Sequence, residues 1–293
     1  MYSNFLDLEP GQGQQQVQVL PVPYEATVSF APGTSQGPGA ILRASYEIET
    51  WDEQLGLDLA DLADFNTLPF FRPRAAGPEQ MLQALQEYLQ QELDPGRDFL
   101  LLLGGEHTLA QAGAWFYQQA YPDLVVLQLD AHADLRASFQ GSPYSHACVM
   151  ARMLDLGLPL AQLGIRSLCQ EESRRIQGAD PARLLTMFAW DLPEPKKAAE
   201  MLRLFVGGRP LYISFDADAL DPAQLPGTGT PEPGGLEFAW LQEFWLWFLP
   251  GLKLVGLDFC ELCPLPGAGV ASESLAVKCI NRILTAYWGA AHD

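Results

Sequence analysis

Residues 124–136, LVVLQLDAHADLR, form a mainly apolar run that ends in three ionisable side chains at alternate positions, Asp130, His132 and Asp134. A short apolar run of this kind is typical of a buried β-strand. Side chains two positions apart on a strand point the same way, so these three converge if the strand continues through them. The sequence therefore predicts a buried strand with a group of potential metal ligands at its carboxyl end.

Similar β-rich runs recur along the chain, at 17–24, 98–105, 161–167, 183–190, 209–218 and 252–262. Several are apolar on both faces, which is typical of a mainly parallel sheet with helices on each side. Segments with helical spacing lie between them, at 79–93, 195–207 and 271–288. The alternation predicts an α/β fold of three layers, α/β/α, and we expect residues 1–293 to form one domain.

The composition limits the possible partners and the compartment. The chain has 17 basic and 36 acidic residues and a formal net charge of -19, which disfavours nucleic acid and anionic membranes as partners. No apolar run approaches the roughly 18 residues that a transmembrane helix requires. The cysteines number 5, an odd count, and the polar start of the chain lacks the apolar core of a secretion signal. We therefore expect a soluble, cytoplasmic protein.

Two further runs end in potential ligands. LYISFDADALDP places Asp216 and Asp218 two positions apart, and LLLLGGEHTLA leads into His107. Sites in open α/β sheets form at the carboxyl ends of the strands, so we expect these side chains to meet those of the 124–136 run. The predicted ligand set is His107, Asp130, His132, Asp134, Asp216 and Asp218.

Four carboxylates in one partly buried place require balancing cations, because like charges raise one another's pKa. Two divalent ions would balance them. Carboxylate-rich ligation with some imidazole suits Mn²⁺, with Fe, Co, Ni and Zn as alternatives. Two ions about 3.5–4 Å apart can lower the pKa of a shared water and so provide a nucleophile near neutral pH. The set predicts a hydrolase with a dinuclear metal centre.

Four motifs together resemble the ureohydrolases, the family of arginase, agmatinase and formimidoylglutamase: GGEHT, DAHADLR, YSHACVMARM and SFDADALDPAQLPGTGTPEPGG. The resemblance extends from about Val22 to the C-terminal helix. It implies the arginase-like fold, two Mn²⁺ ions per subunit, and hydrolysis of a small cationic guanidine to urea and an amine. It also implies a homo-oligomer, a trimer or a hexamer.

The resemblance assigns roles to individual residues. One ion would be held by His107, Asp130, Asp134 and Asp216, and the other by Asp130, His132, Asp216 and Asp218, with Asp130 and Asp216 bridging. His146 in YSHACVM would be a proton shuttle, for which an imidazole is suited. Glu261 in GLDFCELCP would pair with the substrate guanidinium, and Asp134 is expected to act in catalysis as well as in metal binding.

The loop DLRASFQGSPYSHAC, residues 134–148, resembles agmatinases and lacks the elements that arginases use near an amino-acid end. Agmatine, giving putrescine and urea, is therefore the favoured substrate. The alternative is N1-aminopropylagmatine, giving spermidine and urea, and guanidino acids and arginine are less favoured. The N-terminal segment departs from the family pattern: Glu25 replaces the usual Asp, and Ala31, Ser35, Gly39 and Leu42 stand where arginines are common.

Two interpretations from other classes remain open on the sequence. Cys260 and Cys263 have the C-x-x-C spacing of a zinc or redox motif, but no second ligand pair matches it, so we expect them to be packing residues. A non-catalytic binding module on the same fold is the second alternative. Such modules usually lose ligands, whereas every expected ligand is present here.

Overall fold

The computed structural model describes residues 4–9, 11, 13, 15–73, 77–267 and 270–290. Of the 4 histidines of the chain, His292 lies outside the described residues. In the described part of the chain, eight parallel strands form one sheet in the order β4-β1-β5-β10-β9-β6-β7-β8. The strands are β1 (Gln15–Val22), β4 (Ala63–Thr67), β5 (Phe99–Gly104), β6 (Val125–Leu129), β7 (Leu160–Ile165), β8 (Leu184–Phe188), β9 (Pro210–Asp216) and β10 (Lys253–Cys260). Two strands of two residues each, β2 (Trp51–Asp52) and β3 (Leu57–Asp58), form a separate antiparallel hairpin.

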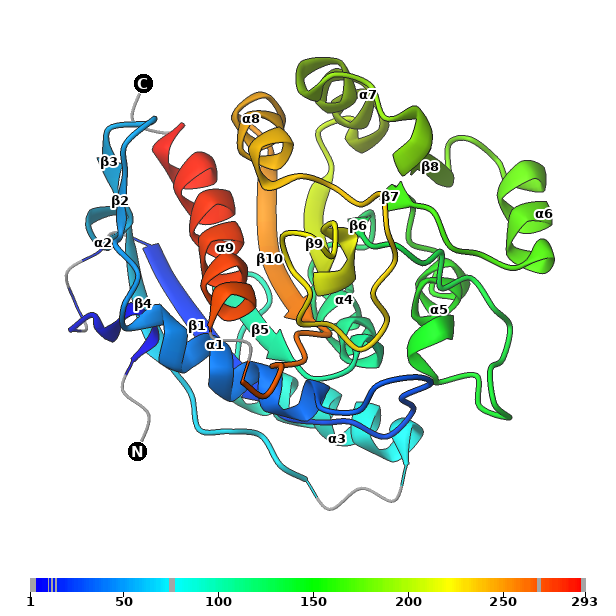
Figure 1. The fold of residues 1–293 in the computed structure, drawn as a ribbon, viewed down its shortest axis with the longest axis horizontal. Helices are drawn as coiled ribbons and strands as arrows, with labels where there is room; N and C mark the ends of the chain where they lie inside the picture. Colours follow the sequence, from blue (N-terminus) through cyan, green and yellow to red (C-terminus); the bar gives the residue numbers. More distant parts are fainter. Residues whose placement is uncertain are drawn as a thin grey trace.

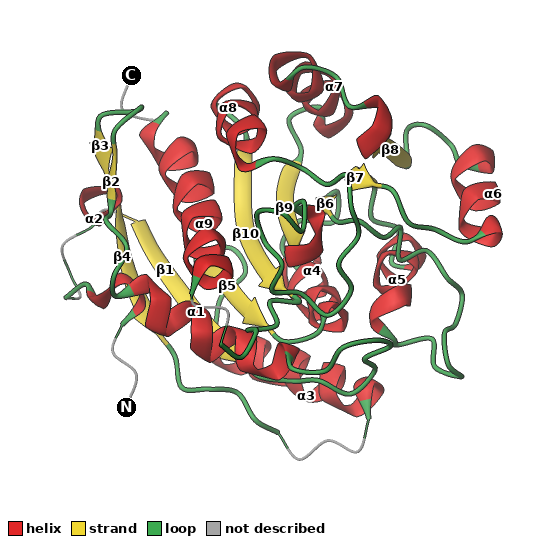
Figure 2. Ribbon diagram, in the orientation of Figure 1, coloured by secondary structure: helices red, strands yellow, loops and turns green. Residues whose placement is uncertain are grey.

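Helices cover both faces of the large sheet, as Figures 1 and 2 show. One apolar core joins the sheet to α1 (Gly37–Ser45), α2 (Leu59–Leu62), α7 (Pro195–Val206), α8 (Phe238–Phe248) and α9 (Ala271–Gly289). The other joins it to α3 (Pro78–Glu92), α4 (Ala110–Gln118) and α5 (Val149–Asp155), with α6 (Gln170–Gly178) beside β8. Short 3-10 helices are η1 (Phe5–Asp7), η2 (Thr34–Gln36), η3 (His107–Leu109), η4 (His146–Cys148), η5 (Ala189–Asp191) and η6 (Ala217–Ala219).

The central strands are buried on both faces. In β5, Leu101 and Leu103 belong to one core while Leu100 and Leu102 belong to the other. Alternate side chains of a strand point to opposite faces, so such a strand needs a helical layer on each side. The predicted three-layer fold with a parallel central sheet is therefore confirmed, and all seven predicted strands are present.

Strand β4 was not predicted from the sequence. Its residues, ADFNT, include Asp64 and Asn66, which do not read as a buried run. It is an edge strand that pairs with β1 on one side only, where polar side chains are tolerated. Helices α3, α7 and α9 confirm the three helical segments predicted from their spacing.

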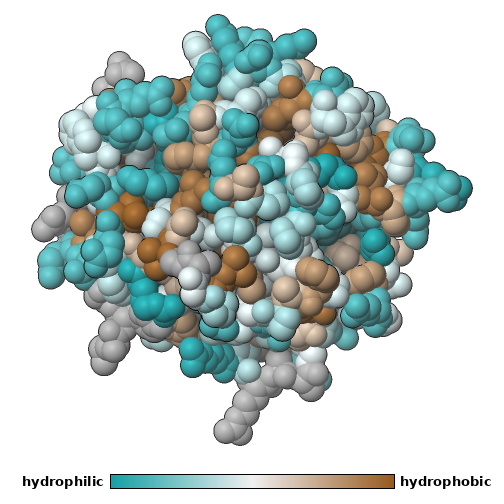
Figure 3. Space-filling view, viewed as in Figure 1, coloured by the Kyte–Doolittle hydropathy of each residue, from teal (hydrophilic) through white to brown (hydrophobic). Residues whose placement is uncertain are grey.

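Of the residues that the structure describes, none form a helix with both the length and the apolar character needed to cross a membrane. Hydrophilic residues cover much of the face seen in Figure 3, with apolar residues in scattered patches. The hydrophilic surface agrees with the strongly negative composition.

Candidate active site

The predicted ligands lie at the carboxyl ends of adjacent strands in the middle of the sheet. His107 begins η3 just after β5, residues 130–134 follow β6, and Asp216 ends β9. Strand β10, which lies between β5 and β9, leads directly into Glu261. Strands β5 and β6 are consecutive in the sequence but are separated in the sheet by β10 and β9. The site thus occupies the crevice where the strand order reverses, the usual position in open α/β sheets.

The prediction that three of these side chains converge by alternating along a strand was wrong. Strand β6 ends at Leu129, so Asp130, His132 and Asp134 do not alternate on a strand. The backbone N–H of His132 donates to Asp130 Oδ1 at 2.6 Å, which turns the chain. Asp134 then adopts a left-handed conformation with φ 53°. The three side chains meet because of this turn and not because of strand periodicity.

Two groups of side chains have ligand atoms close enough to hold a metal ion. One is His107, Asp130 and Asp216, and the other is Asp130, His132 and Asp218. His107 Nδ1 lies 3.2 Å from Asp130 Oδ2 and 3.3 Å from Asp216 Oδ2. It also lies 3.1 Å from Asp134 Oδ2. Asp130 therefore belongs to both groups, as expected for a carboxylate that serves two ions.

The second group has equally short distances. His132 Nδ1 lies 2.9 Å from Asp218 Oδ2 and 3.5 Å from Asp130 Oδ1. The hydroxyl of Thr230 donates to Asp218 Oδ2 at 2.9 Å. Thr230 belongs to the glycine- and proline-rich segment 225–235, so this segment reaches the site.

The donor set fits a pair of divalent cations. Burial, and then the charge of Asp130, raise the pKa of Asp134 to about 7. Burial and the charge of Asp218 raise the pKa of Asp216 well above its ordinary value. The pKa of His132 rises to about 12, because the charges of Asp218 and Asp130 outweigh the opposing effect of burial. These buried groups hold protons that divalent cations would replace.

We expect the stability of the metal-free protein to fall as the pH rises from about 6.5 to 8. Burial raises the pKa of Glu261 to about 8, and the pKa values of Asp134 and His132 are also raised. The folded state therefore retains protons that the unfolded chain has released in this window, which favours unfolding as protons become scarce. His146, with its pKa lowered to about 4, has the opposite effect only below its ordinary value of 6.5.

Calorimetric melting of the metal-free chain at pH 6.5, 7.2 and 8.0 measures this dependence, and Mn²⁺ should raise Tm most at the highest pH. A melting temperature that climbs across this range without metal would show that these carboxyl groups are not held protonated.

His146 is oriented by a hydrogen-bond chain from a buried carboxylate. The hydroxyl of Thr27 donates to Glu106 Oε1 at 3.0 Å. Because the hydroxyl proton of Thr27 is used in this bond, Thr27 Oγ1 acts as the acceptor for His146 Nδ1, at 2.9 Å, and for the His146 backbone N–H, at 3.1 Å. The proton of the neutral ring is therefore placed on Nδ1, which leaves Nε2 as the proton acceptor.

Glu261 is held next to the first ligand group. Its backbone has φ 62°, in the left-handed region, and its N–H donates to the carbonyl of Gly105 at 2.8 Å. Its Oε1 accepts from the backbone N–H of His107 at 2.6 Å. A non-glycine residue in this conformation costs energy, and such residues are common at functional sites. The two hydrogen bonds fix the carboxylate beside the first ligand group despite this cost.

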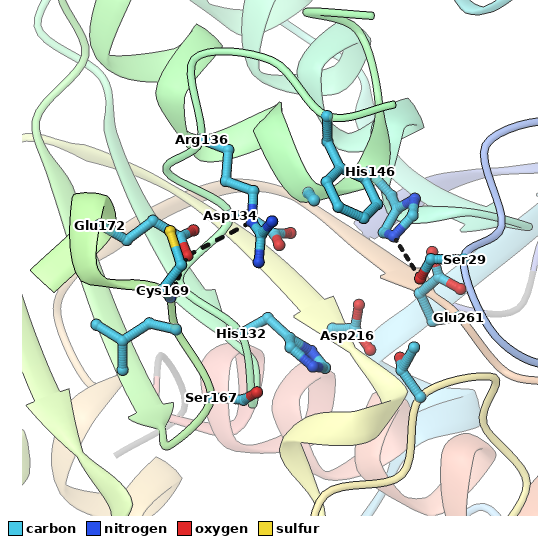
Figure 4. A pocket seen from close by; sticks show the side chains of 14 residues that line it. Ser29, His132, Asp134, Arg136, His146, Ser167, Cys169, Glu172, Asp216 and Glu261 are labelled. Carbon is cyan, nitrogen blue, oxygen red and sulfur yellow. Dashed lines mark hydrogen bonds and ion pairs between the residues drawn. The ribbon is translucent and has the colours of Figure 1, made fainter. Parts of the chain in front are cut away.

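A cavity of about 280 Å³ opens over the site and is lined by His132, Asp134, His146, Asp216 and Glu261 among others. Figure 4 shows His146 and Glu261 on one side of this cavity and Arg136 and Glu172 on the other. Arg136 Nε lies 3.6 Å from Glu172 Oε2, and its guanidinium lies over the Phe139 ring, 4.7 Å from the centroid. Arg136, Phe139 and Glu172 were not predicted as site residues.

Other supporting residues were also missed. Glu106 precedes His107 in the motif GGEHT, and its Oε2 accepts from the backbone N–H groups of Ala26 and Thr27 at 2.6 and 2.7 Å. The position of Glu106 in this motif, directly before the predicted ligand His107, could have indicated that its carboxylate supports the site. Nothing in the sequence pairs Thr27 with His146, which is 119 positions away.

Cys260 and Cys263 are buried, free cysteines, in agreement with the packing interpretation. Cys260 Sγ contacts Asp258 Oδ1 at 3.6 Å, whereas Cys263 Sγ contacts the carbonyl of Pro32 at 3.5 Å. The two thiols thus have different partners. Neither belongs to a potential metal group in the part of the chain that the structure describes.

The fold and this site define a class of enzyme. The chain belongs to the arginase family, whose model matches residues 15–285, and the class is that of ureohydrolases, hydrolases acting on guanidino compounds. The chain is 34% identical to an N(1)-aminopropylagmatine ureohydrolase of Synechocystis sp., over 93% of this chain and 89% of that protein. It is 31% identical to an agmatinase of Bacillus anthracis, over 96% of this chain and 94% of that protein. The solved structure of proclavaminate amidino hydrolase from Streptomyces clavuligerus superposes with a TM-score of 0.80 at 28% identity, covering 99% and 98% of the two chains.

Proposed function

We propose that this chain hydrolyses the guanidinium group of agmatine to urea and putrescine, using a pair of Mn²⁺ ions. The observation that carries the proposal is that Glu261, His146 and two potential ligand groups meet at one cavity. The two ligand groups have Asp130 in common. The substrate is cationic, and the acidic site suits it.

In the proposed site, His107, Asp130, Asp134 and Asp216 hold one ion, and Asp130, His132, Asp216 and Asp218 hold the other. When bound, two divalent cations supply Lewis-acid activation of water. The protein side chains do the remaining work of binding, orientation and proton transfer. Asp134, which contacts His107 and lines the cavity, is in a position to accept a hydrogen bond from the reacting guanidinium.

Glu261 is proposed to bind the guanidinium through paired hydrogen bonds. A planar cation with several N–H donors matches a carboxylate, and this pairing fixes orientation as well as charge. Because Glu261 is tied to His107 by its Oε1, the bound guanidinium would lie beside the ligand groups. The cation would also keep Glu261 ionised despite the burial that raises its pKa.

Hydrolysis breaks the bond between the guanidinium carbon and the alkyl nitrogen, which leaves as an amine and needs a proton. His146 is proposed to carry it. Burial, reinforced by the nearby imidazoles of His107 and His132, lowers its pKa to about 4, so the ring is neutral at pH 7. Water adds its oxygen to the guanidinium carbon and releases a proton. With Nδ1–H held by Thr27, Nε2 can accept that proton and pass it to the leaving nitrogen.

N1-aminopropylagmatine is the second candidate substrate. A relative that is 34% identical to this chain is named for its action on this compound, and one that is 31% identical is named agmatinase. The two substrates share the guanidinium end and differ at the amine end, so Glu261 and the ligand groups serve both. Either reaction belongs to polyamine biosynthesis, and we propose a cytoplasmic homo-oligomer, a trimer or a hexamer.

Urea release from four guanidines tests the substrate class: agmatine, aminopropylagmatine, arginine and 4-guanidinobutyrate, each after loading with Mn²⁺. We expect kcat/KM for at least one of the two amines to exceed that for both acids by about 10-fold or more, because a carboxylate would enter an acidic cavity. Preference for arginine or guanidinobutyrate would refute the assignment. Two bound ions without hydrolysis of any guanidine would favour the non-catalytic alternative.

A further inference from the structure

Five adjacent strands carry a polar side chain in a single row across the interior of the sheet. Ladder pairing aligns the row as Asp258 on β10, Ser214 on β9, Gln128 on β6, Gln162 on β7 and Thr186 on β8. All but Thr186 are 0% exposed. In β6 and β7 the glutamine is the only polar residue of the strand. A buried amide is costly without partners, so such a row needs a physical reason.

From Thr186 on β8 to Gln128 on β6, each side chain of the row donates a hydrogen bond to the next. The hydroxyl of Thr186 donates to Gln162 Oε1 at 2.8 Å, and Gln162 Nε2 donates to Gln128 Oε1 at 2.6 Å. Gln128 Nε2 then donates to Asp130 Oδ2 at 2.6 Å. The chain therefore ends on the carboxylate that both ligand groups share.

Backbone carbonyls fix the direction of the chain. Gln162 Nε2 also donates to the carbonyl of Ala133 at 2.8 Å, and Gln128 Nε2 to that of His132 at 3.2 Å. A flipped amide would place its oxygen against these carbonyls and, for Gln128, against Asp130 Oδ2. Each amide thus has one permitted orientation, and each also holds the turn that carries His132 and Asp134.

The other two residues of the row, Ser214 and Asp258, orient His107 of the first ligand group. His107 Nε2 lies 2.8 Å from Ser214 Oγ, and Ser214 donates to Asp258 Oδ1 at 3.0 Å. This arrangement leaves His107 Nδ1 facing the carboxylates. A ring N–H passed on to a buried carboxylate is a common way to orient a metal-binding histidine.

We propose that Gln128, Gln162 and Thr186 are positioning residues that fix Asp130 and the 130–134 turn for metal binding, although none of the three is itself a ligand. The inference rests on the proposed function only in requiring that the site binds metal. Asp130 Oδ1 accepts from the backbone N–H of His132, and Oδ2 accepts from Gln128, so each oxygen has a fixed protein donor. A carboxylate oxygen retains a second lone pair, and the donors determine where it points.

The test compares Gln128→Leu, Gln162→Leu and the double variant in the full-length chain, freed of metal by a chelator. The Mn²⁺ affinity is measured by titration calorimetry, and the melting temperature is measured without metal. We expect Gln128→Leu to weaken Mn²⁺ binding by about 10- to 100-fold and Gln162→Leu to weaken it by a smaller factor. Because Gln162 acts partly through Gln128 and partly through its own bond to the Ala133 carbonyl, the double variant should bind Mn²⁺ more weakly than Gln128→Leu alone, but by less than the product of the two single losses.

Ser45→Ala is the matched control for loss of a buried polar group. Ser45 is 0% exposed and makes two hydrogen bonds, from the N–H of Leu6 and to the carbonyl of Leu42, away from the site. It should lower the melting temperature and leave Mn²⁺ affinity unchanged. A merely structural role for the glutamines would give this same result.

The inference is overturned if Gln128→Leu or Gln162→Leu binds Mn²⁺ within twofold of the parent chain, or if their losses multiply in the double variant. Should Gln128→Leu not fold, Gln162→Leu and the near-isosteric Thr186→Val decide the matter by the same affinity criterion. Failure of the parent chain to bind Mn²⁺ would instead remove the proposed metal centre itself, which separates the two hypotheses.

Discussion

Replacement of Asp130 by alanine is expected to abolish turnover and to lower the bound Mn²⁺ below two ions per chain. Asp130 is the residue common to both ligand groups, and it is 0% exposed. Its loss removes a ligand from each ion at once, so we expect kcat/KM to fall by at least about 10³-fold, as it does when members of one catalytic unit are removed. Metal analysis and urea release on the same preparation measure both effects.

Asp98→Ala provides the matched control for Asp130→Ala. Asp98 is also a buried aspartate with hydrogen-bond partners, including the backbone N–H of Asp94 at 2.8 Å, but it lies just before β5, at the strand end away from the ligands. It should lower stability while leaving metal content and turnover intact. An Asp130→Ala variant that still binds two ions would show that the sharing of Asp130 is misassigned.

Replacement of His146 by alanine is expected to lower kcat by about 10²- to 10⁴-fold, the usual contribution of a positioned acid or base. Metal content should be unchanged, because His146 belongs to neither ligand group. Its ring contacts Thr27 and Ser29 instead. Added imidazole should restore part of the lost turnover by occupying the space of the missing ring.

His132→Ala is the matched comparison, because it removes a histidine that is proposed to bind metal and not one that is proposed to transfer a proton. His132 lies 2.9 Å from Asp218 and should be needed for metal binding. We therefore expect loss of metal in His132→Ala and retention in His146→Ala. Equal metal loss in both variants would mean that His146 is a ligand and not a proton shuttle.

The strand-end residues could be predicted from the sequence because chemistry and topology agreed. Apolar runs such as LVVLQL define where the strands lie, and parallel strands bring their carboxyl ends to one edge. Asp130, Asp216 and His107 follow those runs directly. Their convergence therefore needs no knowledge of the loops.

The supporting contacts could not be predicted in this way. Gln128 interrupts an apolar run and would count as a defect by pattern alone, yet its amide is paired with Gln162 on the next strand and with Asp130. Thr27 lies 119 positions from the histidine that it orients. Such partners depend on register and loop paths, which side-chain type and periodicity do not encode. The turn at Asp130 was missed for the same reason.

Strand β10 is the last strand among the described residues, yet it lies in the interior of the sheet between β5 and β9. Neighbouring strands are about 4.8 Å apart, so β5 and β9 are held about 10 Å apart by the strand between them. During synthesis on the ribosome, His107 and Asp216 are made before β10, the strand that sets their spacing. Under the proposed metal centre, the group of His107, Asp130 and Asp216 reaches its spacing only after β10 has been made, whereas Asp130, His132 and Asp218 depend on β6 and β9, which are direct neighbours.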